Sequence, residues 1–353
     1  MATARGELAG PRMSSAPLSY LKTLAGVVFT LLLTFVGLTS ITFVIGRVIP
    51  ADPVLAIVGD RAPQNVYEQV YREMGLDRPI YEQYWRYLGK LAEGDLGTSI
   101  MTAQPVMEDI RRFFPATLEL ATIATLIGIF VGIPMGVLAA VKQGRWPDHV
   151  VRVVGLLGYS VPVFWLGLVG LLVFYARLGW VSGPGRIDVF YDDIVTSITG
   201  VILIDAALAG EWDIFWNAIS HLILPATILG TFALAYIARM TRSFMLDQLN
   251  QEYVLTARVK GVSESMVIWR HAFRNVQVQL ITIIGLTYAS LLEGSVLTET
   301  VFSWPGIGQY ITRSLFNADM NAVLGGTIVV GVCFVGINMF SDLLYKLVDP
   351  RAR

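Results

Sequence analysis

Six stretches of uncharged, mostly apolar residues limit most strongly how this chain can fold. Five of them cover residues 23–46, 120–141, 153–176, 214–238 and 320–341, and a shorter one covers residues 275–292. A helix needs about 20 apolar residues to cross the hydrocarbon core of a bilayer, and the shorter run reaches that length if Glu293 lies near a membrane surface. A soluble core does not supply six such runs, so we expect an all-α integral membrane protein with six transmembrane helices.

The composition agrees with a membrane protein and excludes several other classes. Of the 353 residues, 54% are hydrophobic and only 15% are charged, whereas soluble domains carry about 25% charged residues. A net charge of −1 argues against a nucleic-acid partner. A single cysteine, Cys333, and three scattered histidines exclude a disulfide framework and predict no metal site.

The distribution of basic residues predicts the orientation, because short cytoplasmic loops are enriched in Lys and Arg. The segments that face the cytoplasm if the N-terminus is inside carry Arg5, Arg12 and Lys22, then Lys142, Arg145 and Arg152, then Arg239, Arg242, Arg258, Lys260, Arg270 and Arg274, and finally Lys346, Arg351 and Arg353. The segment after the third span carries six acidic residues against two arginines. Both termini are therefore expected in the cytoplasm.

These boundaries predict the organisation of the chain. Residues 1–20 form a mobile cytoplasmic tail, 21–48 the first transmembrane helix, 49–115 an extracytoplasmic segment, 116–347 a five-helix core and 348–353 a cytoplasmic end. The first span is too long for a cleaved signal peptide, and we expect it to remain as an anchor.

Small residues and prolines mark the interiors of the spans. The second span carries five small residues four positions apart, a spacing that lets another helix backbone approach closely: Ala124, Gly128, Gly132, Gly136 and Ala140. We expect generic helix packing there, with a sliding contact between moving helices as the alternative. Kinks are expected at three prolines: Pro134, Pro162 and Pro225.

Ionisable and polar residues near span ends are candidates for a translocation path, because a charge within the bilayer is costly and usually functional. Glu119 lies just inside the second span, and Glu293 lies near the outer end of the fifth. An interfacial position is an equal alternative for both. Asn338 shares a helix face with Asp342, which we expect at the cytoplasmic water boundary.

The loop between the fourth and fifth spans, residues 243–275, is rich in basic residues and predicts two short helices. The first covers residues 247–260 and ends at Gly261 in the left-handed cap conformation. The second is capped by Ser263, with Glu264 at its N-terminal end, and places Met266, Trp269 and Phe273 on one face. Such an amphipathic helix either lies on the membrane surface or docks into a cleft of a cytoplasmic protein.

Residues of this loop resemble the coupling loop of ABC-importer permeases of the peptide/nickel (oligopeptide/dipeptide permease) family. The matching segments are EYVLTARVKG at 252–261 and RHAFRN at 270–275. Further stretches agree in order and spacing: RVIPADP at 47–53, GLDRP at 75–79, GDLG at 94–97, HLILP at 221–225, ETVFSWPGIG at 299–308 and DPR at 349–351.

The resemblance implies an ABC type I importer permease fold and a transport function in a bacterial inner membrane. The chain would form half of a translocation path for di- or oligopeptides, with nickel complexes, glutathione, sugars or opines as alternative cargo. Expected partners are a second homologous permease, two cytoplasmic ATPase subunits and an extracytoplasmic solute-binding protein. The residues expected to contact the ATPase are Glu252, Tyr253, Thr256, Ala257, Lys260, Gly261, Trp269, Arg270 and His271.

The chain itself is expected to perform no bond chemistry. It has no Gly-x-x-x-x-Gly-Lys-Ser/Thr phosphate loop, so ATP and Mg²⁺ are expected on the separate ATPase subunits. An ion-coupled secondary transporter is a second class, but the chain shows no inverted repeat or midplane acidic residues. An intramembrane hydrolase is a third, but no motif pairs Ser160 with His221.

The sequence departs from the family pattern at three positions, and one family motif makes a local structural prediction. Ala51 stands where glycine is usual, Leu255 where arginine is common, and Gln279 where proline is frequent. In the 299–308 motif, Pro305-Gly306 predicts a tight turn with glycine in the unusual backbone conformation. Trp304 is expected at the membrane–water interface.

Overall fold

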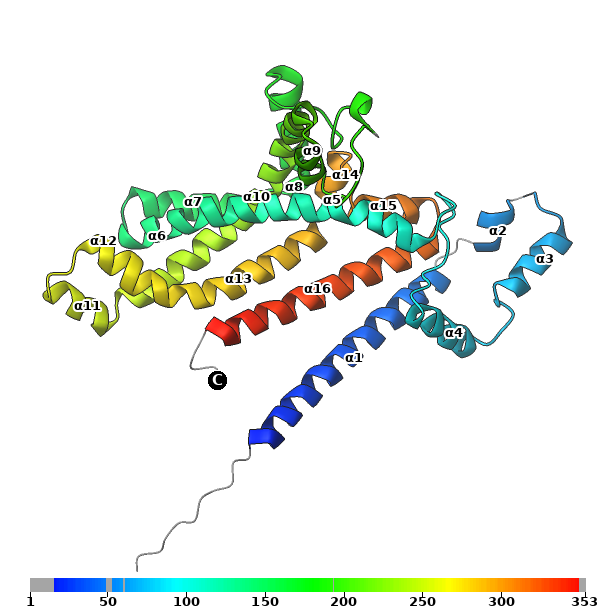
Figure 1. Ribbon diagram of the computed structural model, residues 1–353, viewed down its shortest axis with the longest axis horizontal. Coiled ribbons are helices and arrows are strands. Elements are labelled where there is room, and N and C mark those ends of the chain that lie inside the picture. Colours follow the sequence, from blue (N-terminus) through cyan, green and yellow to red (C-terminus); the bar gives the residue numbers. More distant parts are fainter. Residues whose placement is uncertain (1–15, 49–52, 60, 193, 349–353) are drawn as a thin grey trace, which may run out of the picture.

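A computed structural model describes residues 16–48, 53–59, 61–192 and 194–348, and these form an all-helical molecule (Figure 1). Within these ranges the only pairing of extended backbone is an isolated bridge between Thr98 and Pro105. The elements, in which η marks π-helical or 3-10 turns, are α1 Ala16–Val48, α2 Pro53–Val58, α3 Gln64–Glu73, α4 Ile80–Ala92, α5 Val106–Ile127, η1 Gly128–Gly132, α6 Ile133–Val141, α7 Trp146–Ser160, α8 Val163–Gly170, η2 Leu171–Arg177, η3 Val189–Tyr191, α9 Ile202–Ala209, α10 Trp212–Leu249, α11 Glu252–Val259, α12 Glu264–Met266, η4 Val267–Ala272, α13 Phe273–Gly294, α14 Val296–Val301, α15 Ile307–Phe316 and α16 Met320–Val348.

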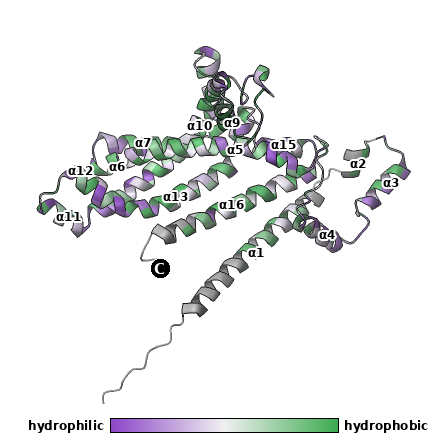
Figure 2. Cartoon of the chain, viewed as in Figure 1, coloured by the Kyte–Doolittle hydropathy of each residue, from purple (hydrophilic) through white to green (hydrophobic). Residues whose placement is uncertain are grey.

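Four helical stretches are long and apolar enough to cross a membrane. They are Val106–Val141, Trp212–Leu249, Glu264–Gly294 and Met320–Ser341, and they correspond to the second, fourth, fifth and sixth predicted spans. The helix α1 contributes a shorter apolar stretch, Phe29–Val44. Apolar colouring follows these helices along their length (Figure 2). The prediction of a helical, multi-pass membrane protein is therefore confirmed.

The kink predicted at Pro162 is confirmed, and it is sharp enough to divide the third predicted span, residues 153–176, into two helices. The helices Trp146–Ser160 and Val163–Arg177 meet at an angle of 99°. Pro162 causes the break, because it lacks a backbone N–H and forces the preceding residue away from helical geometry; Val161 is extended, with φ −92° and ψ 124°. Pro225, by contrast, lies inside the helix α10, which continues without a break on both sides of it.

The helix α10 is at the centre of the packing. The small residues predicted to form a groove lie against it: a Cβ added to Gly128 would lie 2.8 Å from the Ala233 Cβ, and one added to Gly136 would lie 2.5 Å from the Ala238 carbonyl oxygen. The largest buried cluster joins α5, α10 and α13 around Leu120, Leu229, Ile237 and Leu291. The small-residue spacing thus serves close packing of the second span on the fourth.

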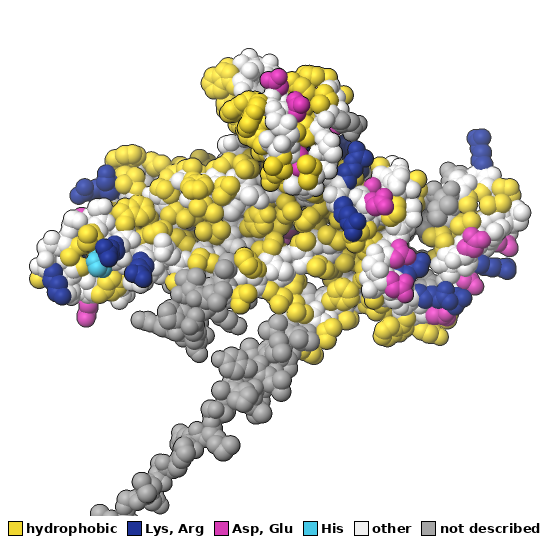
Figure 3. Space-filling view, in the orientation of Figure 1, with side chains coloured by type: hydrophobic (Ala, Val, Ile, Leu, Met, Phe, Trp, Pro, Cys, Tyr) yellow, Lys and Arg dark blue, Asp and Glu magenta, His cyan; other side chains and the backbone are white. Residues whose placement is uncertain are grey.

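The surface agrees with a bilayer around the helices. Charged side chains gather at the two ends of the long axis, over α11–α12 and over α3–α4, while the flanks between them are largely apolar (Figure 3). Phe130, Leu156, Leu168 and Leu172 are each more than half exposed. In water such exposure would be costly, whereas hydrocarbon chains of lipids accept it.

The helices α3 and α4 are polar and follow one another along the chain, and α4 lies beside the end of α1 (Figure 1). Neither helix has a fully buried residue. Tyr84 of α4 bonds Ser40 of α1 through their hydroxyls at 2.9 Å, and its ring contacts the Phe43 ring edge-on at 5.2 Å. The family-like segments at 47–53 and 349–351 lie wholly or partly outside the described residues, as does Ala51.

Candidate functional site

The loop between α10 and α13 keeps the predicted turn but not the two predicted short helices. The long helix α10 continues to Leu249, and α11 begins only at Glu252, so the helix expected over 247–260 is divided by a turn. The second expected helix is not separate, because α12, η4 and α13 follow one another without a gap. Gly261 is left-handed as predicted, with φ +76°.

Ser263 occupies the expected N-cap position, but its side chain makes no capping hydrogen bond. The turn is instead closed by the backbone, with the Val267 N–H donating to the Ser263 carbonyl at 3.0 Å. A Cβ added to Gly261 would meet nothing within 4 Å. This glycine is therefore required for its backbone conformation and not for space.

One face of the loop is buried and anchors it to the membrane helices. Val254, Ala257 and Val267 pack with Val137 and Met245. Two hydrogen bonds add to this anchor: the Asn275 Nδ2 donates to the Tyr253 hydroxyl at 3.0 Å, and that hydroxyl donates to Gln248 Oε1 at 2.8 Å. Motion of the loop must therefore be transmitted to α10 and α13.

The opposite face of the loop is apolar and uncovered. Leu255 is 62% exposed, Val259 is 81% exposed and Trp269 is 48% exposed. The Trp269 ring contacts the Phe273 ring edge-on at 5.2 Å. Basic and acidic side chains surround this apolar surface, which we call the docking face; its exposed members are Glu252, Leu255, Thr256, Val259, Lys260, Met266, Trp269 and Arg270, with His271 half-buried beside them.

A buried ion pair joins the part of α10 that precedes this loop to the start of α7, just after the turn between the second and third spans. Asp148, whose side chain is fully buried, accepts hydrogen bonds from Arg242 Nε at 2.5 Å and from Arg152 Nη2 at 3.0 Å. It also accepts the Gly144 backbone N–H at 2.9 Å. The sequence reasoning missed this junction; the spacing of Asp148 and Arg152, four residues apart on a helix, was the available signal.

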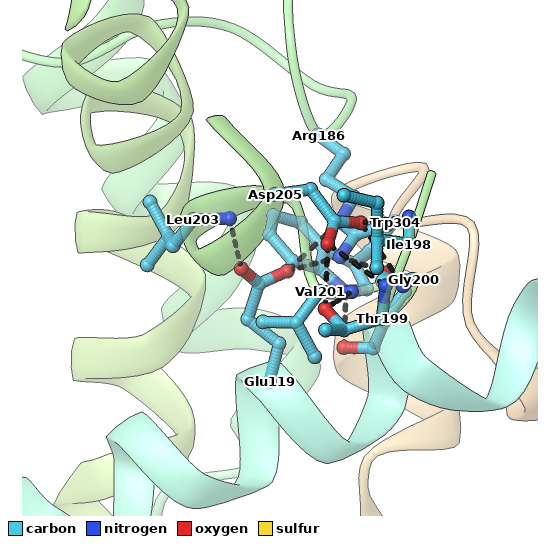
Figure 4. A network of polar contacts seen from close by, with 10 residues as sticks. Glu119, Arg186, Ile198, Thr199, Gly200, Val201, Leu203, Asp205 and Trp304 are labelled. Atoms are coloured by element: carbon cyan, nitrogen blue, oxygen red, sulfur yellow. Dashed lines mark hydrogen bonds and ion pairs between the residues drawn. The ribbon is translucent and has the colours of Figure 1, made fainter. Parts of the chain in front are cut away.

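Glu119 is not free to face a path, because it is bound to an outer loop (Figure 4). Its Oε2 accepts Arg186 Nε at 2.8 Å and Nη2 at 2.5 Å, and its Oε1 accepts the Leu203 backbone N–H at 3.2 Å. Arg186 also donates to the Gly200 carbonyl at 2.9 Å, and its guanidinium lies 5.9 Å from the Trp304 ring centroid. We call this group of contacts the outer clamp.

Asp205 fixes the same loop from its other side. Its carboxylate accepts the backbone N–H groups of Ile198, Thr199 and Gly200 and the Thr199 hydroxyl. Burial alone would raise the pKa of the Asp205 carboxyl, but these donors outweigh it and hold that pKa below its usual range. The loop from 186 to 205 is therefore fastened at both of its ends.

The 299–308 motif is a buried support beside this clamp, and two predictions for it are wrong. Trp304 is fully buried and not interfacial, because its indole N–H donates to the Ala116 carbonyl at 2.9 Å. Gly306 has φ −100°; the left-handed residue is Ser303, with φ +48°. Gly306 is needed for space, since an added Cβ would lie within 2.5 Å of both Glu299 Oε1 and Thr117 Oγ1.

Glu299 is the polar centre of that support. Its carboxylate accepts hydrogen bonds from the Thr117 hydroxyl at 2.7 Å, the Ser295 hydroxyl at 2.9 Å and the Gln309 backbone N–H at 2.9 Å. Burial raises the pKa of this carboxyl despite these donors. The contacts attach the motif to α5.

The three predicted path residues do not contact one another. Glu119 belongs to the outer clamp, while Glu293 is exposed at the outer end of α13 and pairs with none of the described residues. Asn338 lies half-buried on α16, and its Oδ1 is buried without a hydrogen-bond partner. The side chain of Asp342 lies outside the part that the structure describes.

The residues considered for other chemistry are not arranged for it. His221 contacts the Gly183 carbonyl through Nδ1 at 3.0 Å and Asp188 Oδ1 through Nε2 at 3.3 Å, not Ser160. Among the described residues no three His, Cys, Asp or Glu side chains lie close enough to hold a metal ion.

Comparisons with known proteins identify related chains over nearly the whole length. The family described as "Binding-protein-dependent transport system inner membrane component" matches residues 132–353, and that described as "Binding-prot-dependent transport system membrane comp, N-term" matches residues 20–121. The probable D,D-dipeptide transport system permease protein DdpB of Escherichia coli K12 is 45% identical over 91% of this chain and 94% of its own length. The di/tripeptide transport system permease protein DppB of Pseudomonas aeruginosa is 45% identical over 91% and 95%.

One solved structure resembles the fold. The inward-facing MetNI methionine ABC transporter matches with a TM-score of 0.51 and 16% identity, over 69% of this chain and 97% of the matched chain. At this identity the match concerns the fold alone. It indicates the helix arrangement of an ABC importer permease.

Proposed function

Because the chain belongs to the family of binding-protein-dependent transport system inner membrane components, we propose that it forms half of the translocation path of an ATP-driven peptide importer. It is a multi-pass inner-membrane protein and a transport subunit, not an enzyme. The observation that carries the peptide assignment is its 45% identity, over 91% of the chain, to permeases named for D,D-dipeptide and di/tripeptide transport. These names favour short peptides over nickel complexes, glutathione, sugars or opines.

The proposed topology has six spans with both termini in the cytoplasm. The four long apolar helices, the bent pair α7–η2 and the apolar part of α1 support six crossings if the bent pair counts as one. The basic docking loop then lies inside, and the helices α3 and α4 within segment 49–115 lie outside. The sequence-derived division into a 1–20 tail, a first helix, a 116–347 core and a 348–353 end remains part of this proposal.

The docking face is proposed to bind a cytoplasmic ATPase subunit. A partner protein would cover Leu255, Val259 and Trp269, whose combined exposure is otherwise costly in water. The charged rim of Glu252, Lys260 and Arg270 fits the polar edge of a protein interface. ATP and Mg²⁺ would be bound by that subunit, and this chain would supply only the mechanical contact.

Force applied at the docking face has a continuous route into the bundle. The buried anchor of Val254 and Val267 passes it to α10 and α13, and the Asp148–Arg242 pair passes it to α7. Moving the transporter between two conformations, from a ratio of 1:99 to 99:1, takes about 5.5 kcal/mol. The loop must be rigid to transmit this free energy from the ATPase to the helices. The tight contact of α6 with α10 at Gly136 is the proposed pivot.

The remaining path residues are proposed to act at the two ends of the route. Glu293, exposed at the outer end of α13, would favour cationic groups on the cargo by its charge. Asn338 presents a buried oxygen without a partner, which cargo, water or a second permease subunit would satisfy. Glu119 would act indirectly, by fastening the outer loop through Arg186.

Transport by the complete assembly tests this proposal. The chain is co-purified with a second homologous permease, the two ATPase subunits and the solute-binding protein, and reconstituted into liposomes. We expect uptake of radiolabelled alanyl-alanine that requires ATP on the ATPase side and the binding protein on the other. Uptake driven by an ion gradient without ATP would instead indicate a secondary transporter and reject the proposal.

A further inference from the structure

A cavity of about 880 Å³ lies on the proposed extracytoplasmic side, away from the outer clamp. It is lined by α3, α4, Phe43 of α1, the start of α16 as far as Ile328 and the loop from 95 to 103, and it is open on one side. Cavities that bind small molecules in proteins measure about 300–1,000 Å³. The cavity is therefore large enough for a short peptide.

Part of the wall is one regular face of the helix α4. On α4 the lining residues are Gln83, Arg86, Tyr87 and Lys90, whose spacing of three and four places them on one side of the helix. The exposed Tyr81 and Trp85 are not among them. The sequence of α4 thus divides into an aromatic face and a polar, cationic face that lines the cavity.

Charges of both signs line the cavity without pairing with each other. Arg86 lies 3.5 Å from Glu82 on its own helix, and Lys90 forms no ion pair with any residue in the described ranges. Glu73, which also lines the cavity, accepts only a neutral hydrogen bond from Gln69 at 2.8 Å. Asp95 accepts the Gly97 backbone N–H at 2.8 Å. Cations and anions that form no ion pair with one another therefore line the same cavity, and each retains bonding capacity.

An unsatisfied acceptor adds to this arrangement. Gln83 donates through its Nε2 to the carbonyls of Leu76 and Arg78, which fixes the orientation of its amide. Its Oε1 is buried and has no hydrogen-bond partner, and Gln83 is one of the residues that line the cavity. A buried acceptor without a donor is costly, and a ligand with N–H groups would remove this cost.

We propose that this cavity binds the zwitterionic backbone of a short peptide on the permease itself. Arg86 and Lys90 receive the terminal carboxylate, Glu73 and Asp95 attract the terminal ammonium, and Gln83 Oε1 accepts an N–H. Both signs of charge needed for the two ends of a zwitterion are present in the cavity lining. The peptide identity rests on the proposed function.

The lining also has an apolar part, which includes Phe43, Leu96, Leu324 and Ile328. This part would receive the side chains of the peptide, while the charged residues take its two ends. Figure 3 shows basic and acidic side chains together over this end of the molecule. A site of this kind would let the permease select among peptides after the binding protein has released them.

Peptide binding to the reconstituted transporter without its solute-binding protein tests the site. The probe is tritiated alanyl-alanine, and the transporter is held in lipid nanodiscs. We expect Arg86→Gln with Lys90→Gln to weaken binding about three- to tenfold, and Glu73→Gln or Gln83→Leu to weaken it by a similar factor. The C-amidated dipeptide should bind weakly to wild type and to the Arg86/Lys90 variant alike.

Arg72→Gln is the matched control, since Arg72 lies on α3 with a 73% exposed side chain, pairs with Glu68 and does not line the cavity. A second measurement avoids any loss of folding: in Leu324→Cys, alanyl-alanine should slow maleimide labelling of the new cysteine in the cavity wall. Equal binding by wild type and all cavity variants, or labelling unaffected by peptide, overturns the inference. The inference is also overturned if the cavity variants lose bound phosphatidylethanolamine while their peptide binding stays unchanged.

The two proposals fail in different ways. If wild type with its binding protein shows no ATP-dependent uptake of alanyl-alanine, the proposed function fails and the peptide identity falls with it. If uptake is normal but the cavity variants bind and transport like wild type, only the cavity inference fails.

Discussion

Replacing Glu119 with glutamine should destabilise the transporter, because it leaves the Arg186 guanidinium buried without its counter-charge. The Glu119 side chain is 1% exposed and that of Arg186 is 15% exposed. Removing one member of a buried ion pair costs about 3–5 kcal/mol. The bond to Gly200 and the contact with Trp304 remain and offset about 1 kcal/mol, so we expect a net loss of about 2–4 kcal/mol.

A double-mutant cycle measures this coupling directly. Glu119→Gln, Arg186→Gln and the double variant are compared by thermal unfolding of the purified transporter in detergent, followed by tryptophan fluorescence. The double variant should be less destabilised than the sum of the single variants, by about 1–3 kcal/mol. Arg313→Gln, at an exposed arginine of α15, is the control for loss of one positive charge. Additivity within about 0.5 kcal/mol would refute the outer clamp.

Four other substitutions make separate predictions. Gly261→Val should abolish peptide uptake while basal ATPase activity persists, because a β-branched residue at φ +76° costs about 1–3 kcal/mol; normal uptake would refute the role of this turn. Gly136→Ala should lower the unfolding temperature, since its Cβ would lie 2.5 Å from a carbonyl oxygen, whereas Gly155→Ala, with nothing within 4 Å, should not. Glu293→Gln should reduce uptake of cationic peptides more than of neutral ones, and equal reduction would remove it from the path. Asp205→Asn should make the loop from 186 to 205 more sensitive to protease. Because the pKa of Asp205 is lowered from 3.8, the stability that its carboxylate gives to the wild type is present above about pH 4 and is lost as the pH falls further. If the variant and the wild type showed the same dependence of stability on acid pH, this prediction would be contradicted.

The positions of the long apolar helices were largely predictable, because a run of about 20 apolar residues forms a helix in lipid. The break at Pro162 was not fully predictable. Pro225 is also a proline within an apolar run, yet it lies inside a continuous helix, so the outcome depends on tertiary neighbours. Gly261 was predictable because its conformational requirement is local.

The polar contacts that position the site were the part that sequence reasoning missed. Glu119 and Arg186 are 67 residues apart, and Thr117 and Glu299 are 182 apart, so only the fold brings them together. The position of Trp304 was mispredicted for a related reason. Tryptophan suits an interface, but a buried indole is equally stable when a distant carbonyl, here that of Ala116, accepts its N–H.

The central claim is that the docking face of the loop between α10 and α13 contacts an ATPase subunit in the cytoplasm. Photo-crosslinking residues placed at Leu255 and Trp269, which are 62% and 48% exposed, are compared with one at the fully buried Val254. In the assembled transporter we expect the two exposed positions to capture the ATPase subunit and Val254 to capture only this chain. Capture of phospholipid alone from Leu255 and Trp269 would contradict the account.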